Sequence, residues 1–245
     1  MTTSGSFSYN PSIGEITLYA FNLCGVRGTA LTQEYMTSAR TAINMLLSRW
    51  SNMGVNLWEV DLVTTSLVQG QSVYNVDANT VMILDAYVSV PDGIGGYTDR
   101  LIMPVSRSEY ASYPNKTQQG FPTVFWFDRL SGRAAPSSSG IDTQPTVTIW
   151  PVPDPVGSGN PTLLKYYRVT QIQNADLTSG QTPDIPYRWL DALANGLAYY
   201  LARMWQPGLV PQLKAEADEA YAIAAAQDTE NVAMYISPMI GGYFR

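Results

Sequence analysis

The chain contains no histidine and a single cysteine, Cys24. Without histidine, Ser-His-Asp and Cys-His nucleophilic sites and all zinc sites that use imidazole are excluded. One cysteine cannot form a disulfide within the chain. Catalytic sites built on carboxylates alone remain possible.

The sequence also lacks an apolar run of the ~18 residues that a membrane span needs. Its start, MTTSGSFSYN, does not resemble a signal peptide. We expect a protein made and kept in the cytosol, or in a particle built there.

Charged residues are scarce. They make up 14% of the chain, whereas soluble domains have roughly 25%. The formal net charge is -6, and Lys116, Lys165 and Lys214 are the only lysines among the 14 basic residues. The chain has 16 Tyr, 6 Trp and 9 Met, and aromatic residues, methionine and arginine are the types enriched in the cores of protein interfaces. This composition favours a subunit of an assembly over a monomer of modest charge.

Helical periodicity begins near the N-terminus. Ser12 and Glu15 match a capping box, and apolar residues at helical spacing follow them, which predicts a helix over residues 12–23. Thr32 precedes a second amphipathic pattern, which predicts a helix that ends before Gly54.

Helical periodicity returns near the C-terminus. The sequence predicts a helix after Pro183, with Asp184 as its N-cap, and a last helix that starts at Pro211 and ends near Gln227.

The middle of the chain has the two-residue period of β-strands and is rich in β-branched and aromatic residues. Gln69-Gly70-Gln71 predicts a hairpin turn between the first two strands. A short helix is predicted over residues 106–113. The predicted strands cover residues 57–63, 66–76, 81–90, 98–105, 123–130, 146–150 and 162–169.

Together these patterns predict an α+β fold with three parts. A helical bundle is formed by the N- and C-terminal segments, residues 1–54 and 183–230. An antiparallel β domain, residues 55–182, is inserted between them. An extended C-terminal arm, residues 231–245, completes the chain.

The C-terminal arm has the sequence NVAMYISPMIGGYFR, with Arg245 as its only charged residue. Chain ends are usually mobile unless something holds them. An arm this apolar suggests docking, either onto its own body or onto a partner. We favour a partner, because the helix ending near Gln227 already completes a packed domain. The candidate docking residues are Met234, Tyr235, Ile236, Met239, Ile240, Tyr243, Phe244 and Arg245.

No motif predicts a cofactor, a metal site or nucleic-acid recognition, and we expect no enzyme. The segment Gly93-Ile94-Gly95-Gly96 lacks the Lys-Ser/Thr that follows a phosphate loop, so it is interpreted as a turn. The basic residues are scattered, without a patch interleaved with aromatic residues.

Five short segments are informative in their order along the chain: residues 19–26 (YAFNLCGV), 44–54 (NMLLSRWSNMG), 67–70 (LVQG) with Tyr74, 149–154 (IWPVPD) and 184–189 (DIPYRW). Together they resemble the head-to-tail adaptor proteins of short-tailed phages (podoviruses). This family contains tail accessory factors and packaged-DNA stabilisation proteins, and is related to tail tubular protein A. The resemblance spans roughly residues 13–204, and the polar loop 131–145 is not placed in the family pattern.

The resemblance implies a ring of about twelve copies below the portal protein, in the neck of the virion. Such a ring extends the DNA channel, helps retain packaged DNA and offers a platform for the tail nozzle and the fibres or spikes. The bundle contacts the portal and neighbouring copies, the β domain faces the tail, and the arm reaches along the portal. DNA passes without specific recognition. Twelve copies at -6 each carry about -72, which disfavours phosphate binding, although net acidity is also common among soluble proteins.

Two other functions stay open. A tail-associated peptidoglycan hydrolase needs only a carboxylate pair, and Glu59 and Glu109 have no evident structural role. A minor capsid protein has the same interface-prone composition but does not contact the portal.

Overall fold

The computed structural model describes the chain except for residues 1–4, 55–56, 131–143, 155–161, 178–179 and 230–245. The described residues fall into two compact units. The unit we call the helical unit comprises the described residues of 1–46, 177–182 and 186–229. The other, the β unit, comprises those of 47–176 and 183–185. The fold is α+β, as predicted. Its α-helices are α1 (Ile13–Leu23), α2 (Gln33–Ser51), α3 (Arg107–Ser112), α4 (Leu190–Trp205) and α5 (Val210–Gln227).

The predicted capping box is present at the start of α1. The Ser12 hydroxyl accepts a hydrogen bond from the Glu15 N–H at 3.2 Å, and the Glu15 carboxylate accepts one from the Ser12 N–H at 2.7 Å. These reciprocal bonds satisfy N–H groups that the first turn leaves without helical partners. The hydrogen bond from the Ser12 backbone also lowers the pKa of Glu15.

The predicted cap at Asp184 is wrong. A 3-10 turn, Tyr187–Trp189, precedes α4, and Pro186 is the residue that caps this turn. The Asp184 carboxylate instead accepts a hydrogen bond from the Gln173 N–H at 3.2 Å. An aspartate near a helix start favours capping, but tertiary contacts gave this side chain another donor.

Helix α4 carries much of the core of the helical unit. Leu193, Leu197 and Leu201 are fully buried on it, and it packs against both α1 and α5. Gly196 lies on the side that faces α2. A Cβ added there would come within 2.8 Å of the Leu46 Cδ2 atom, so the glycine permits close approach of that side chain. The end of α4 is held by Trp205, whose ring stacks on Tyr35 at 4.2 Å between ring centroids.

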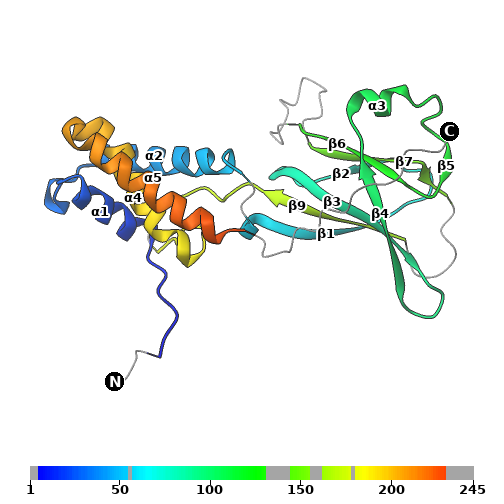
Figure 1. Cartoon of the computed structure of the whole chain (residues 1–245), viewed down its shortest axis with the longest axis horizontal. Helices are drawn as coiled ribbons and strands as arrows, with labels where there is room; N and C mark the ends of the chain where they lie inside the picture. The colour runs from blue at the N-terminus through cyan, green and yellow to red at the C-terminus, as the bar shows by residue number, and fades with distance from the viewer. Residues whose placement is uncertain (1–4, 55–56, 131–143, 155–161, 178–179, 230–245) are drawn as a thin grey trace, which may run out of the picture. The chain divides into compact units, whose positions relative to one another are not determined.

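The β unit contains a seven-stranded sheet with the order β1-β9-β3-β4-β6-β7-β2, and a two-stranded sheet of β5 and β8 (Figure 1). The strands are β1 (Val60–Ser66), β2 (Val73–Asn75), β3 (Thr80–Pro91), β4 (Tyr97–Pro104), β5 (Gln119–Gly120), β6 (Val124–Asp128), β7 (Thr146–Trp150), β8 (Val152–Pro153) and β9 (Leu163–Thr170).

The predicted hairpin between the first two strands is wrong. The segment around Gly70 does turn, with a φ of 77° at that glycine, but β1 pairs with β9 and β2 pairs with β7. The two strands therefore lie at opposite ends of the sheet order. Period-two alternation identifies a strand and its buried face, but it does not identify the neighbour that completes the hydrogen-bond ladder.

The sheet is mixed, whereas an antiparallel domain was predicted. Strands β4 and β6 are parallel, with Met103 opposite Val124 and Pro104 opposite Phe125. Strands β5 and β8 are parallel as well. A parallel pair needs a crossover rather than a tight turn. Residues 105–123, which include α3, supply that crossover between β4 and β6.

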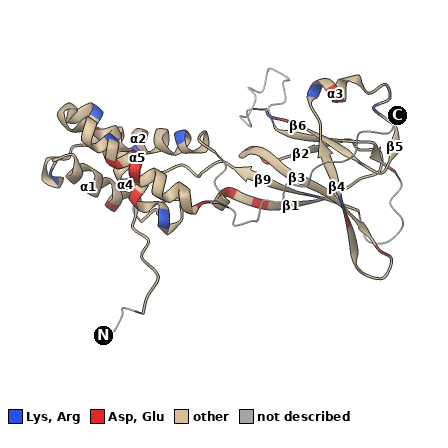
Figure 2. Cartoon of the chain, viewed as in Figure 1, with Lys and Arg blue, Asp and Glu red and all other residues tan. Residues whose placement is uncertain are grey.

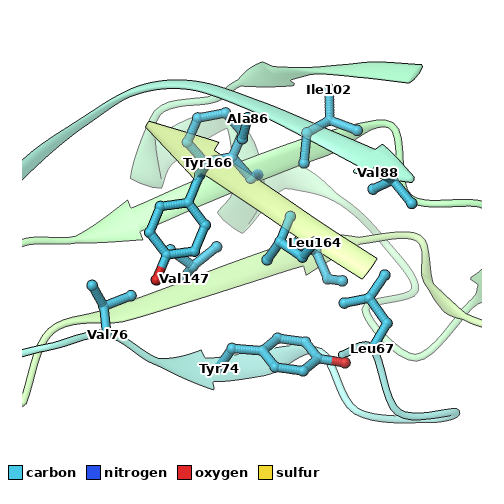
Figure 3. Close-up of a cluster of buried hydrophobic side chains, with 11 residues drawn as sticks. Leu67, Tyr74, Val76, Ala86, Val88, Ile102, Val147, Leu164 and Tyr166 are labelled. Carbon is cyan, nitrogen blue, oxygen red and sulfur yellow. The ribbon is translucent and has the colours of Figure 1, made fainter. Parts of the chain in front are cut away.

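One hydrophobic core joins both ends of the sheet. Leu164 on β9 and Val88 on β3 belong to the same cluster as Val147 on β7 and Tyr74 on β2, and their side chains converge in Figure 3. Strands this far apart in the order can share a core only if the sheet curls. The Tyr74 hydroxyl accepts a hydrogen bond from the Val68 N–H and donates one to the Gln71 carbonyl, which holds the preceding turn beside the core.

Helix α3 packs on the sheet through aromatic rings. Tyr110 stacks on Trp126 of β6 at 5.6 Å between centroids, and Tyr113 stacks on Trp150 of β7 at 4.4 Å. The Trp150 indole N–H also donates to the Asn115 carbonyl at 3.0 Å. These tryptophans are structural anchors of α3.

Candidate functional site

The predicted docking arm lies outside the described residues. The candidate docking residues Met234, Tyr235, Ile236, Met239, Ile240, Tyr243, Phe244 and Arg245 are all among the residues that are not described, so the structure places none of them. The last described residue is Thr229, directly after the C-cap of α5.

The end of α5, from which the arm continues, is held by an ion pair within the helical unit. An Arg188 Nη2 donates to the Asp228 Oδ1 at 2.6 Å, and the Asp228 side chain is only 4% exposed. Arg188 is 42% exposed, so the pair is partly screened by solvent. The contact ties the last turn of α5 to the 3-10 turn before α4. Sequence reasoning missed this pair, although the matching segment 184–189 contains Arg188.

A hollow of about 440 Å³ lies next to this ion pair, and we call it the root hollow. Its wall is aromatic, because Tyr9 meets Tyr187 edge-on at 6.4 Å between centroids and Tyr19 is exposed beside them. Its charged groups are Glu15, Arg188 and Asp191. The full lining is Tyr9, Pro11, Glu15, Ile16, Tyr19, Tyr187, Arg188, Leu190, Asp191 and Ala194.

A second hollow, of about 470 Å³, lies between α2 and α4, and we call it the methionine hollow. Met45 and Met204 line it and are 59% and 47% exposed. The Arg203 guanidinium, also in the lining, lies 5.6 Å from the centroid of the Tyr200 ring. The full lining is Thr37, Ser38, Thr41, Ala42, Met45, Tyr200, Arg203 and Met204.

The β unit presents an exposed apolar face on the solvent side of β1, β9, β3 and β4. Leu62 lies opposite Tyr167, and Tyr87 lies opposite Leu101, which is 64% exposed. The Lys165 ammonium lies over the rings of Tyr87 and Tyr97, at 5.7 and 5.8 Å from their centroids. Exposed apolar side chains gathered on one face make it a candidate interaction site. Sequence reasoning missed this face.

The charges of the described residues do not form a binding patch for phosphate. Figure 2 shows Lys and Arg scattered singly over each unit.

The two carboxylates considered for hydrolysis are not brought together. Glu59 is 6% exposed at the start of β1, where it accepts a hydrogen bond from the Thr170 hydroxyl at 2.8 Å. Glu109 is exposed in the first turn of α3, which packs on β6. Within the β unit, α3 lies well away from the start of β1 (Figure 1), so the structure offers this pair no common cleft.

Burial gives Glu59 a pH-dependent effect on stability. Desolvation raises the pKa of Glu59 in the folded protein, and the neighbouring Asp184 and Asp61 raise it further. Protonation of Glu59 stabilises the folded protein, because the folded-state pKa is higher than the unfolded-state pKa. This stabilisation is fully present at pH values below the unfolded-state pKa and is lost as the pH rises through the folded-state pKa. We expect Glu59→Gln to raise the unfolding temperature at pH 7, because the amide is neutral and its oxygen still accepts the Thr170 bond. The gain should shrink as the pH falls toward ~4.5.

The matched control for Glu59→Gln is Glu109→Gln, which removes an exposed carboxylate of the same unit. We expect it to change stability by less than about 0.5 kcal/mol. Thermal unfolding of both variants between pH 4 and pH 8 measures the difference. A Glu59→Gln protein less stable than the parent at pH 7 contradicts the argument.

The single cysteine is not placed as a nucleophile. Cys24 is fully buried, its thiol donates to the Ala198 carbonyl at 3.1 Å, and burial raises its pKa to about 11. Among the described residues no group of three Asp, Glu or Cys side chains is placed to hold a metal ion. Nor does that part of the chain contain a helix both long and apolar enough to cross a membrane.

Comparison with known proteins agrees with the resemblance found in the sequence. The family model described as "SU10 adaptor protein" matches residues 23–240. No match was found among the curated proteins. Because the matched segment covers most of the chain, the chain belongs to the SU10 adaptor protein family, which is a family of phage head-to-tail adaptors.

Proposed function

We propose that this protein forms a ring of about twelve copies that binds below the portal protein, in the neck of a short-tailed phage. The ring extends the DNA channel, helps to retain packaged DNA and gives a platform for the tail nozzle and the fibres or spikes. The bundle of residues 1–54 and 183–230 faces the portal and neighbouring copies. The β domain, residues 55–182, faces the tail, and the arm, residues 231–245, docks on the portal.

The observation that carries this proposal is the extent of the family match. It runs to residue 240 and so includes the first part of the C-terminal arm, with Met234, Tyr235, Ile236, Met239 and Ile240. The match thus extends past α5 into the arm, which supports a role for this segment in the adaptor.

The root of the arm supports the same proposal. Because the Arg188–Asp228 pair holds the end of α5, the arm starts from a fixed point of the helical unit. A fixed start reduces the number of positions that the arm samples, and so reduces the entropy lost when it docks. Docking repeated around a ring strengthens the attachment further, because each arm binds while its neighbours hold the ring in place.

The exposed apolar surfaces of both units support a role in assembly. The methionine hollow and the apolar face of the β unit expose Met45, Met204, Leu62, Leu101 and Met103. A protein with this many exposed apolar side chains and few charges is suited to contacts on several sides.

Deletion of residues 231–245 tests the proposal. We expect a folded protein that no longer cosediments with portal-bearing heads, with a loss of about a hundredfold or more in affinity, because all apolar contacts of the arm are removed. The folded state is checked by circular dichroism and by the midpoint of urea unfolding. Electron microscopy of the complex with heads gives the symmetry and the copy number.

A matched control keeps the arm and changes only polar side chains in it, with Asn231→Ser and Ser237→Ala. This variant should bind as the parent does. Normal binding of the truncated protein to portal-bearing heads refutes the docking arm. A complex whose symmetry differs from that of the portal refutes the ring.

A further inference from the structure

An N-terminal arm, residues 5–11, leaves the helical unit as an extended chain ahead of α1 (Figure 1). Phe7 is 104% exposed, as much as in an extended peptide, and Tyr9 is 71% exposed. The arm contains no charged residue. A phenylalanine ring left wholly in water gains free energy wherever it can be covered. This arm lies before residue 23 and so outside the family match.

We propose that the arm binds the next copy of this protein, with the Phe7 ring inserted into the methionine hollow of that copy. The inference rests on the ring of the proposed function. Ring formation needs a heterologous contact, in which one surface of a copy meets a different surface of its neighbour. The arm lies ahead of α1 and the methionine hollow lies between α2 and α4, so one helical unit carries both halves of such a contact.

The chemistry of the methionine hollow fits a neutral aromatic arm. Met45 and Met204 supply flexible thioethers, which make favourable contacts with aromatic rings. The Thr37 and Thr41 hydroxyls in the lining donate to the Gln33 and Thr37 carbonyls, and their oxygens can still accept hydrogen bonds from the serines of the arm. Arg203 is the only charged residue in the described lining, and its guanidinium already lies over Tyr200. Entry of Phe7 therefore does not bury an unpaired carboxylate.

The reach of the arm is short. Tyr9 lies against its own helical unit, and two extended residues from Tyr9 to Phe7 span about 7 Å. Phe7 therefore contacts only a copy that packs directly against this one.

The root hollow is a less suitable receptor for Phe7. Tyr9 and Pro11 of the chain's own arm already line it, together with Arg188 at the root of the C-terminal arm. None of the described lining residues of the methionine hollow comes from the N-terminal arm.

Crosslinking between two singly substituted chains tests the proposal. Full-length Ser8→Cys chains, which keep the Phe7 ring, and Met45→Cys chains of different mass are mixed, bound to portal-bearing heads and oxidised. We expect a disulfide-linked heterodimer, because docking holds the two thiols at an effective concentration of about a millimolar. Cys24 does not compete, because it is fully buried.

The matched control pairs Ser8→Cys with Ile223→Cys; Ile223 is on α5, is 63% exposed and does not line the hollow. The Met45 pair should give about tenfold more heterodimer than this control. Phe7→Ala should weaken association between copies about tenfold or more, without changing the unfolding midpoint.

The outcomes separate this inference from the proposed function. Rings that bind heads but give no excess heterodimer overturn the arm contact and leave the ring intact. A chain that carries both Ser8→Cys and Met45→Cys and crosslinks only within itself overturns the contact too. If the parent chain forms no ring on heads, the proposed function fails and this inference fails with it.

Discussion

Replacing Trp189 by alanine is expected to lower the free energy of unfolding of the helical unit by about 3–5 kcal/mol. Trp189 is 1% exposed, and its ring meets Tyr221 of α5 edge-on at 5.4 Å between centroids. Truncation removes the apolar surface of the largest fully buried side chain among the described residues and leaves a cavity between the 3-10 turn and α5. The loss is measured by urea unfolding, and hydrogen exchange of peptides from α5 assigns it to this unit.

The control is Tyr187→Ala, two positions earlier in the same turn. Tyr187 is 74% exposed, so its truncation should cost less than about 1 kcal/mol. Equal losses for the two variants would mean that the turn itself, rather than the buried ring, carries the stability. Because the same turn carries Arg188, Trp189→Ala should also loosen the root of the C-terminal arm and weaken attachment to heads.

The second large effect is expected in the β unit, where Arg168 on β9 is 9% exposed. Its guanidinium donates two bonds to Asp61 at 2.7 and 3.0 Å and one bond to Asp77 at 2.6 Å. The hydrogen bond with Asp61 raises the pKa of Arg168, and the bond with Asp77 raises it further, so the group stays charged. The free energy of unfolding of the double variant Asp61→Ala, Asp77→Ala should be lower by about 3 kcal/mol or more, because the variant leaves a buried cation without an anion.

Removing the cation instead should cost much less. The side chains of Asp61 and Asp77 are 50% and 69% exposed, so water can solvate them when Arg168 is absent. Methionine is of similar length and fills the space of the arginine stem. We expect Arg168→Met to cost about 1 kcal/mol. If Arg168→Met lowers the free energy of unfolding as much as the double aspartate variant does, the cluster stabilises the β unit through packing rather than through charge. Urea unfolding of the three proteins at one ionic strength decides the order.

Local chemistry explains what could be predicted from the sequence. The capping box of Ser12 and Glu15 needs only groups three residues apart, and it formed as predicted. The strands β3, β4, β7 and β9 lie close to their predicted ranges, because alternation and β-branched residues act within a few residues. The α+β class follows from the order of these elements along the chain. The adaptor family was recognised from short segments, and the family match supports it.

Long-range contacts explain what could not be predicted. Strand β1 pairs with β9, and Tyr74 on β2 belongs to the same core cluster as Val147 on β7. Neither partner could be predicted from the sequence. The parallel pair of β4 and β6 depends on where the crossover through α3 packs. The methionine hollow exists only because α2 and α4 come together, with Gly196 allowing the approach of Leu46.

The sequence by itself therefore determined the class of fold, the places of most helices and strands, and the family. Each of these depends on the spacing of residue types along the chain, which can be read from the sequence. Only the tertiary structure decided the order of the strands, the burial of Glu59 and Arg168, and the pairing of Arg188 with Asp228. These features depend on which of many possible distant contacts bury the most apolar surface while pairing buried charges such as that of Arg168.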